Sequence, residues 1–167
     1  LLDALPILRA KGIPCQLQLV LNKAEHFLPA AVLDKIEHAT AEGLIQNFGS
    51  ERIPHAEALK MSDAADVNFV LEGMRPPHST AGARPAVAIC APTLPIGDYL
   101  REAGIGVDCH NVNGVTERVI EIWNWTRGGK APDWYTPVDG AIEKYSFRGM
   151  ATKMNAVLDK AYADSHL

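Results

Sequence analysis

Short apolar runs alternate with longer stretches of helical periodicity along this chain, and this alternation constrains its fold more than any other feature. Five runs are predicted to be strands, at residues 15–21, 44–48, 66–71, 86–91 and 105–109. Strands that are apolar almost throughout are buried on both faces. The sequence therefore predicts an α/β fold: a Rossmann-like, mainly parallel sheet with helices on both faces.

Six helices are predicted before, between and after these strands, each from the residues at the start of the helix. They are expected to begin at Asp3, Pro29, Pro54, Ile96, Asn113 and Ser146. Proline suits the first turn of a helix because its ring fixes φ there. Asn113 suits the capping position because its side chain can accept a hydrogen bond from an amide of the first turn. The helix after Pro54 is expected to turn Leu59, Met61 and Ala65 inward.

Composition excludes several classes of protein. The chain has 16 Lys and Arg against 20 Asp and Glu, a net charge of −4, so net charge does not favour nucleic acid or anionic lipid as a partner. Its longest apolar run, residues 86–91, falls far short of the roughly 20 residues that span a membrane. Three cysteines without a Cys-x-x-Cys motif favour reduced, buried thiols in the cytoplasm. Six histidines with no i, i+4 pair predict no metal site.

Three loops are the expected location of a ligand site. Ligands of parallel α/β sheets bind at the carboxyl ends of the strands. The loops that follow the first three predicted strands occupy residues 22–28, 49–53 and 72–84. The last is the longest, and long loops are often functional.

Polar residues in these loops are candidate ligand contacts, each with a structural alternative. Glu72 suits hydrogen bonds from sugar hydroxyls, or is a solvated carboxylate. His78 suits phosphate binding or a general base. Ser79 and Thr80 suit phosphate binding, or cap a turn. Lys23 suits a phosphate as a point charge, or is simply solvated.

Several short motifs follow one another in a fixed order between residues 5 and 162. They are Phe48-Gly49, Ala65-Asp66-Val67, Glu72-Gly73, Arg84-Pro85-Ala86-Val87, Gly104-Ile105-Gly106-Val107 and Tyr145-Ser146-Phe147. In this order and spacing they resemble the nucleotide-binding domain of retaining GT-B glycosyltransferases of the group 1 type. The resemblance implies that residues 1–167 form one Rossmann-like donor-binding domain. It further implies an amino-terminally truncated piece of a two-domain protein, because Leu1 falls inside the family's first helix.

The resemblance also implies roles for particular residues. Glu72 is expected to contact the donor sugar, and Gly73 and Met74 to donate backbone hydrogen bonds to sugar or phosphate. Ser79 and Thr80 are weaker phosphate or ribose contacts. Thr80 stands where the family carries a second Glu, so that carboxylate contact with the ribose is missing.

The function implied by the resemblance is transfer of a sugar from a nucleoside-diphosphate sugar to an acceptor hydroxyl, in polysaccharide or glycoconjugate synthesis. His78 is the candidate catalytic residue, and no cofactor or metal is expected. The acceptor, a sugar or a lipid-linked glycan, would bind the missing amino-terminal domain, which could also bring the protein to a membrane. We expect the 167 residues alone to be inactive. The alternatives are a non-catalytic module that binds nucleotide sugars or proteins, and a related epimerase or phosphorylase. No lysine is placed for a pyridoxal cofactor, which ranks phosphorylase low.

Overall fold

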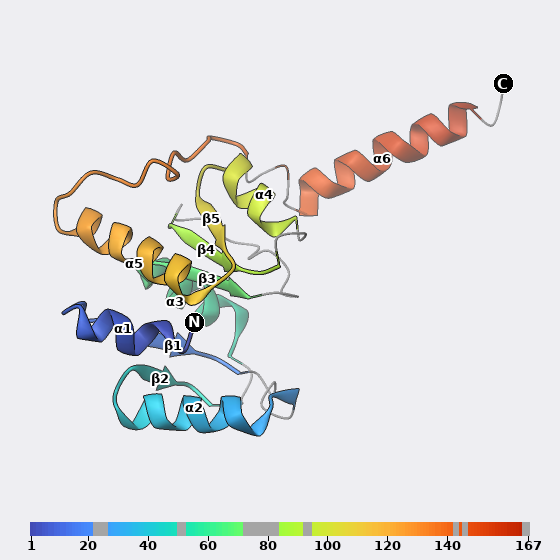
Figure 1. The fold of residues 1–167 in the computed structure, drawn as a ribbon. Helices are drawn as coiled ribbons and strands as arrows, with labels where there is room; N and C mark the ends of the chain where they lie inside the picture. The colour runs from blue at the N-terminus through green and yellow to red at the C-terminus, as the bar shows by residue number, and fades with distance from the viewer. Residues whose placement is uncertain are drawn as a thin grey trace.

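The computed structural model describes residues 1–21, 27–49, 53–71, 84–91, 95–141, 144 and 147–164. Within these residues there are six helices and five strands, which alternate except that β4 directly follows β3 and α6 follows α5 (Figure 1). The elements are α1 (Ala4–Ala10), β1 (Leu17–Leu19), α2 (Ala30–Ala41), β2 (Ile45–Asn47), α3 (His55–Ala64), β3 (Asn68–Leu71), β4 (Ala86–Ile89), α4 (Ile96–Glu102), β5 (Gly106–Cys109), α5 (Val112–Thr126) and α6 (Phe147–Asp164). All five strands predicted from the sequence are present, and every pairing among the described residues is parallel.

The strands form two sheets, where the sequence predicted one. β1 pairs with β2, and β4 lies between β3 and β5. Within the described part of the chain, no pairing joins β1 to β3. The architecture is therefore α/β with short parallel sheets, which is compatible with a Rossmann-like fold.

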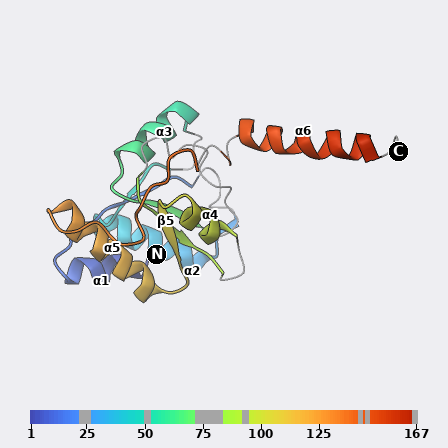
Figure 2. The same ribbon diagram turned by 90° about the horizontal axis from the view of Figure 1, so that it is seen from above.

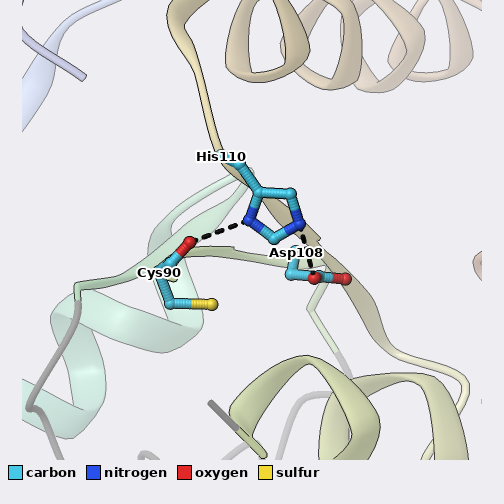
Figure 3. Close-up of side chains that lie close together, drawn as sticks. All are labelled: Cys90, Asp108 and His110. Carbon is cyan, nitrogen blue, oxygen red and sulfur yellow. Dashed lines mark hydrogen bonds and ion pairs between the residues drawn. The ribbon is translucent and has the colours of Figure 1, made fainter. Parts of the chain in front are cut away.

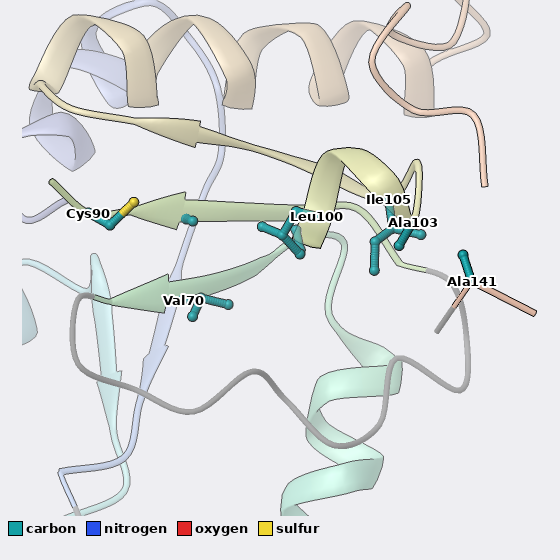
Figure 4. Close-up of a cluster of buried hydrophobic side chains, with 8 residues drawn as sticks. Val70, Cys90, Leu100, Ala103, Ile105 and Ala141 are labelled. Atoms are coloured by element: carbon teal, nitrogen blue, oxygen red, sulfur yellow. The ribbon is translucent and has the colours of Figure 1, made fainter. Parts of the chain in front are cut away.

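Helices cover both faces of the larger sheet, as predicted. Ala86 and Ala88 of β4 pack in one apolar cluster with Leu100 of α4, and Figure 4 shows Leu100, Ala103 and Ile105 gathered beside the strands. Val87, between them, packs in another cluster with Val115 of α5. Side chains of a strand alternate between its faces, so β4 is buried on both sides, as expected of a central parallel strand.

A glycine turn joins α4 to β5 and holds a later segment beside it. Gly104 has a φ of +65°, and a Cβ there would collide with the carbonyl oxygen of Thr136. That close approach lets the amide of Thr136 donate to the Gly104 carbonyl at 2.8 Å, and the amide of Val138 donate to Ala103 at 3.0 Å. A residue other than glycine would be strained at this φ as well as crowded.

The helix start predicted at Asn113 is wrong by two residues. Asn111 has an extended backbone and precedes α5, and its side-chain oxygen accepts a hydrogen bond from the amide of Gly114 at 2.8 Å. Asn113 already lies in the first turn of α5. Trp123, further along this helix, packs against the cluster of Leu8 and Val119.

Two helices, α3 and α6, are poorly buried. In α3 no residue is fully buried, so Leu59 and Met61, predicted to face inward, are only half-buried. α6 extends away from the other elements (Figures 1 and 2). Its apolar side chains are exposed, namely Met150, Met154, Val157, Leu158 and Tyr162. Among the described residues, none of the helices combines the length and apolar character needed to cross a membrane.

Candidate functional site

The carboxyl ends of the strands in the larger sheet lie level with one another. Leu71, the last residue of β3, is paired with Ile89 of β4, and Ile89 is paired with Cys109 of β5. The residues that follow these three strands therefore start from the same edge of the sheet. This carboxyl edge is where parallel α/β sheets bind their ligands.

The site residues predicted from the sequence belong to loops outside the described residues. This applies to Lys23, Glu72, Gly73, Met74, His78, Ser79 and Thr80. The structure gives the starting points of their loops, which follow Leu21 and Leu71. Their roles remain predictions.

Three described side chains that sequence reasoning missed come together at the carboxyl edge (Figure 3). Cys90 directly follows β4, Asp108 lies in β5, and His110 directly follows β5. His110 Nδ1 lies 2.8 Å from the carbonyl oxygen of Cys90, and its Nε2 lies 3.1 Å from Asp108 Oδ2. We refer to Cys90, Asp108 and His110 as the edge cluster.

The imidazole of His110 lies between two acceptors. A neutral ring carries one N–H and can donate to only one of them, whereas a protonated ring donates to both the Cys90 carbonyl and the Asp108 carboxylate. Figure 3 shows the Cys90 thiol on the same side as these groups. The edge cluster thus holds the ring in one orientation, with the histidine side chain still 40 % exposed.

Asp108 is the centre of a charge network. Its side chain is 15 % exposed, and its two oxygens face Arg101 and His110. Arg101 also donates to Asp98 at 2.6 Å. The hydrogen bond to Asp98, together with the charge of Asp108, raises the pKa of Arg101. The carboxylate of Asp108 therefore contacts two basic side chains, of which Arg101 carries a permanent positive charge.

Gly97, in the first turn of α4, allows this network to form. A Cβ at that position would lie 2.6 Å from Asp108 Cγ, a separation that real Cβ atoms do not show. The helix can approach β5 this closely only because residue 97 has no side chain.

The edge cluster contains donor atoms that could coordinate a metal ion. Its sulfur, carboxylate oxygen and ring nitrogen lie within 4.8 Å of one another. Cysteine, histidine and aspartate are the usual ligands of zinc. The carboxylate, however, already binds Arg101, and the ring already bridges Asp108 and Cys90. The contacts of Asp108 and His110 are therefore already used within the protein, and we assign no metal to the edge cluster.

Sequence spacing could not reveal the edge cluster, because its members come from two neighbouring strands. The signal that singled out Glu72, a polar residue directly after a predicted strand, also applies to His110, whereas Cys90 falls inside the strand predicted at residues 86–91.

The two thiols outside the edge cluster, those of Cys15 and Cys109, have surroundings that lower their reactivity. Burial raises the pKa of Cys109 and of Cys15, so both stay protonated at neutral pH, and a thiol is a poor nucleophile in that form. No disulfide links any of the three cysteines, all of which lie in the described residues. The prediction of reduced thiols is confirmed in this respect, although Cys15 is only half-buried.

A second feature lies at the carboxyl ends of β1 and β2. An open hollow of about 570 Å³ is lined by Leu21, Asn47 and Gly49 from the strand ends, and by Leu33, Ile36 and Thr40 from α2. Its volume falls within the range of about 300–1,000 Å³ typical of small-molecule sites. The loop beginning at Gly49 is one of the three loops that the sequence predicts to hold a ligand site.

Compared with protein-family models, curated proteins and solved structures, the chain matches none of them. The class defined by the structure is an α/β protein with parallel sheets.

Proposed function

We propose that this chain is the donor-binding domain of a GT-B-type glycosyltransferase, which transfers a sugar from a nucleoside-diphosphate sugar to an acceptor hydroxyl. The observation that supports the proposal most is the common carboxyl edge of β3, β4 and β5. The motif Glu72-Gly73, on which the family resemblance depends, follows β3 directly at this edge. Leu71, the residue before this motif, is paired with Ile89, the residue before Cys90.

The segment that follows β5 supplies groups that favour the diphosphate. His110 is partly exposed there, and its contacts with Asp108 and the Cys90 carbonyl fix its orientation. α5 begins two residues further on, so the amides of its first turn lie nearby and favour an anion. With a net charge of −4, the domain holds its ligand by such local groups rather than by a general positive field.

The hollow beside α2 provides space for the nucleoside. Leucine, isoleucine and the stem of Glu37 supply apolar surface, and Asn47 supplies an amide. A base can pack on such surface while the amide contacts its polar edge. The ligand would then extend from this hollow toward the loop after β3.

The chemistry assigned to this domain is stabilisation of the leaving diphosphate. In the transfer, the bond between the anomeric carbon and the diphosphate oxygen breaks, and the acceptor oxygen forms a new bond to that carbon. The acceptor proton passes to the leaving diphosphate. Groups placed to stabilise the charge that develops lower the barrier. His110, and His78 as the predicted catalytic residue, are the candidates for this role.

Calorimetric titration of the 167-residue chain with uridine, guanosine and adenosine diphosphates and their sugars tests the proposal. We expect saturable binding of one nucleotide series. Loss of a hydrogen bond to a charged group costs about 1.5–3 kcal/mol, so Glu72→Ala should weaken binding of the diphosphate sugar by about tenfold or more.

The matched control is Glu42→Ala. Glu42 follows α2 and lies near the start of β2, at the opposite edge of its sheet, where it contacts Arg9. This variant should bind as the unmodified chain does. If no nucleotide binds, the proposal is contradicted, and the alternative of a protein-interaction module is favoured.

A further inference from the structure

One side of β1 offers backbone groups that no described strand uses. The amide of Leu17 donates to the Leu44 carbonyl at 2.9 Å, and the Leu19 carbonyl accepts from Phe48 at 3.0 Å. In a parallel pair, the N–H and C=O of one residue point to the same neighbouring strand, and those of the next residue point the other way. The N–H and C=O of Gln18 therefore point away from β2.

β3 has the same kind of open side. The amide of Asn68 donates to the Pro85 carbonyl at 2.9 Å, so Asn68 and Val70 use their backbone groups toward β4. Phe69, between them, points its N–H and C=O away from β4. Within the described residues, β1 pairs with β2 alone and β3 with β4 alone.

The two open sides belong to neighbouring sheets. Figure 1 shows the strands one above another in the order β2, β1, β3, β4, β5. α1 packs against both sheets, because Leu5 belongs to the cluster of Ile45 in β2, and Ala4 to the cluster of Val87 in β4. The open sides of β1 and β3 are thus held next to one another by one helix.

The order of the strands matches that of a doubly wound sheet in which one strand position is empty. A doubly wound sheet of six strands has the spatial order 3-2-1-4-5-6. If β1 to β5 are counted as strands 2 to 6, the observed order is 3-2 followed by 4-5-6. The place of strand 1 falls between β1 and β3. In this arrangement the connection from strand 1 to strand 2 is a crossover helix, and the helix that precedes β1 is α1.

We propose that a sixth strand, joined to the amino end of α1, pairs with both β1 and β3 and unites the two sheets. The strand would bond to the backbone of Gln18 on one side and of Phe69 on the other. It would be apolar on both faces, because a central parallel strand is buried on both. Leu1, which leads into α1, packs against the same cluster as Val67 and Phe69, so such a strand would end close to β3. This inference concerns the scaffold and does not depend on any nucleotide.

Hydrogen exchange of single amides tests this proposal directly, first on the unmodified chain. The amides of Gln18 and Phe69 should exchange at least about tenfold faster than those of Leu17 and Asn68, which are bonded within the same strands. If all four exchange equally slowly, the two sides are not open, and the proposal is wrong.

The second measurement adds the strand. An extension of six Val, Ile and Thr residues, fused before Leu1, should slow exchange at Gln18 and Phe69 by about tenfold or more. The matched control replaces every second residue of the extension by proline, which lacks the N–H that pairing needs. If the first extension leaves a folded chain with unchanged exchange at both positions, or if the proline extension protects them equally, the proposal is overturned.

Discussion

Asp108 shows how one carboxylate can organise the edge of a sheet. It lies in β5 with 15 % of its side chain exposed, and it faces Arg101 on α4 and His110 after the strand. A buried charge is costly unless it is paired. Every feature that brings these partners close therefore contributes to stability as well as to the orientation of His110.

The first prediction at this scale concerns Gly97. Gly97→Ala places a methyl group 2.6 Å from Asp108 Cγ and forces the carboxylate away from its partners. Such crowding typically costs about 1–3 kcal/mol, which urea denaturation measures. Gly114→Ala is the matched control, because its Cβ would meet no atom closer than 3.5 Å. Equal stability of the two variants would contradict the account.

The roles of single residues were harder to predict from the sequence than the positions of helices and strands. The choice between Asn111 and Asn113 depends on which backbone is extended before the helix begins, and two asparagines two residues apart offer the same local signal. The edge cluster depends on the register of β4 and β5, which local sequence does not encode.

At the scale of elements, α5 combines a cap, a core stripe and a position beside the edge cluster. Asn111 caps it through the amide of Gly114 at 2.8 Å, and Val115, Val119 and Ile122 are buried along one face. The apolar spacing of this face was enough to predict the helix, because its period matches the helical turn.

The second prediction tests the cap. Asn111→Ala removes the acceptor and should destabilise the protein by about 1 kcal/mol, measured as a shift in the urea midpoint. Asn113→Ala removes an exposed side chain from the first turn and should change stability by no more than about 0.5 kcal/mol. If Asn113→Ala is the more damaging change, the assignment of the cap is wrong.

Burial of α3 and α6 could not be predicted from their sequences. Each has apolar residues at helical spacing, and such a stripe shows which face can be buried but not what buries it. In the structure Leu59 and Met61 of α3 are half-buried, and the stripe of α6 is exposed. Burial depends on which elements lie alongside, a property of the tertiary arrangement.

At the scale of the whole molecule, the alternation of strands and helices was predictable, and the pairing of the strands was not. Five short apolar runs predicted β1 to β5, and apolar composition predicted that β4 would be covered on both faces. The separation into two sheets arises because β1 and β3 do not pair within the described residues. That is a long-range relation, with α2, β2 and α3 between them in sequence.

The proposed function involves two separate features of the whole molecule. The hollow beside α2 and the edge cluster both lie at carboxyl ends of strands, although they belong to different sheets. A nucleoside diphosphate is long enough to need both a space for the base and a separate place for the phosphates. A single bound ligand should therefore affect both the hollow beside α2 and the edge cluster.

Titration of the ¹⁵N-labelled chain with uridine, guanosine and adenosine diphosphate sugars, followed by amide chemical shifts, tests this claim most directly. One nucleotide series should shift the amides of Cys90, His110 and Gly49 along a single binding curve. Gly43 and Gly104, which precede β2 and β5 at the opposite ends of these strands, should keep their positions. Shifts confined to Gly43 and Gly104, or unchanged spectra with all three nucleotide series, would contradict the proposed donor site.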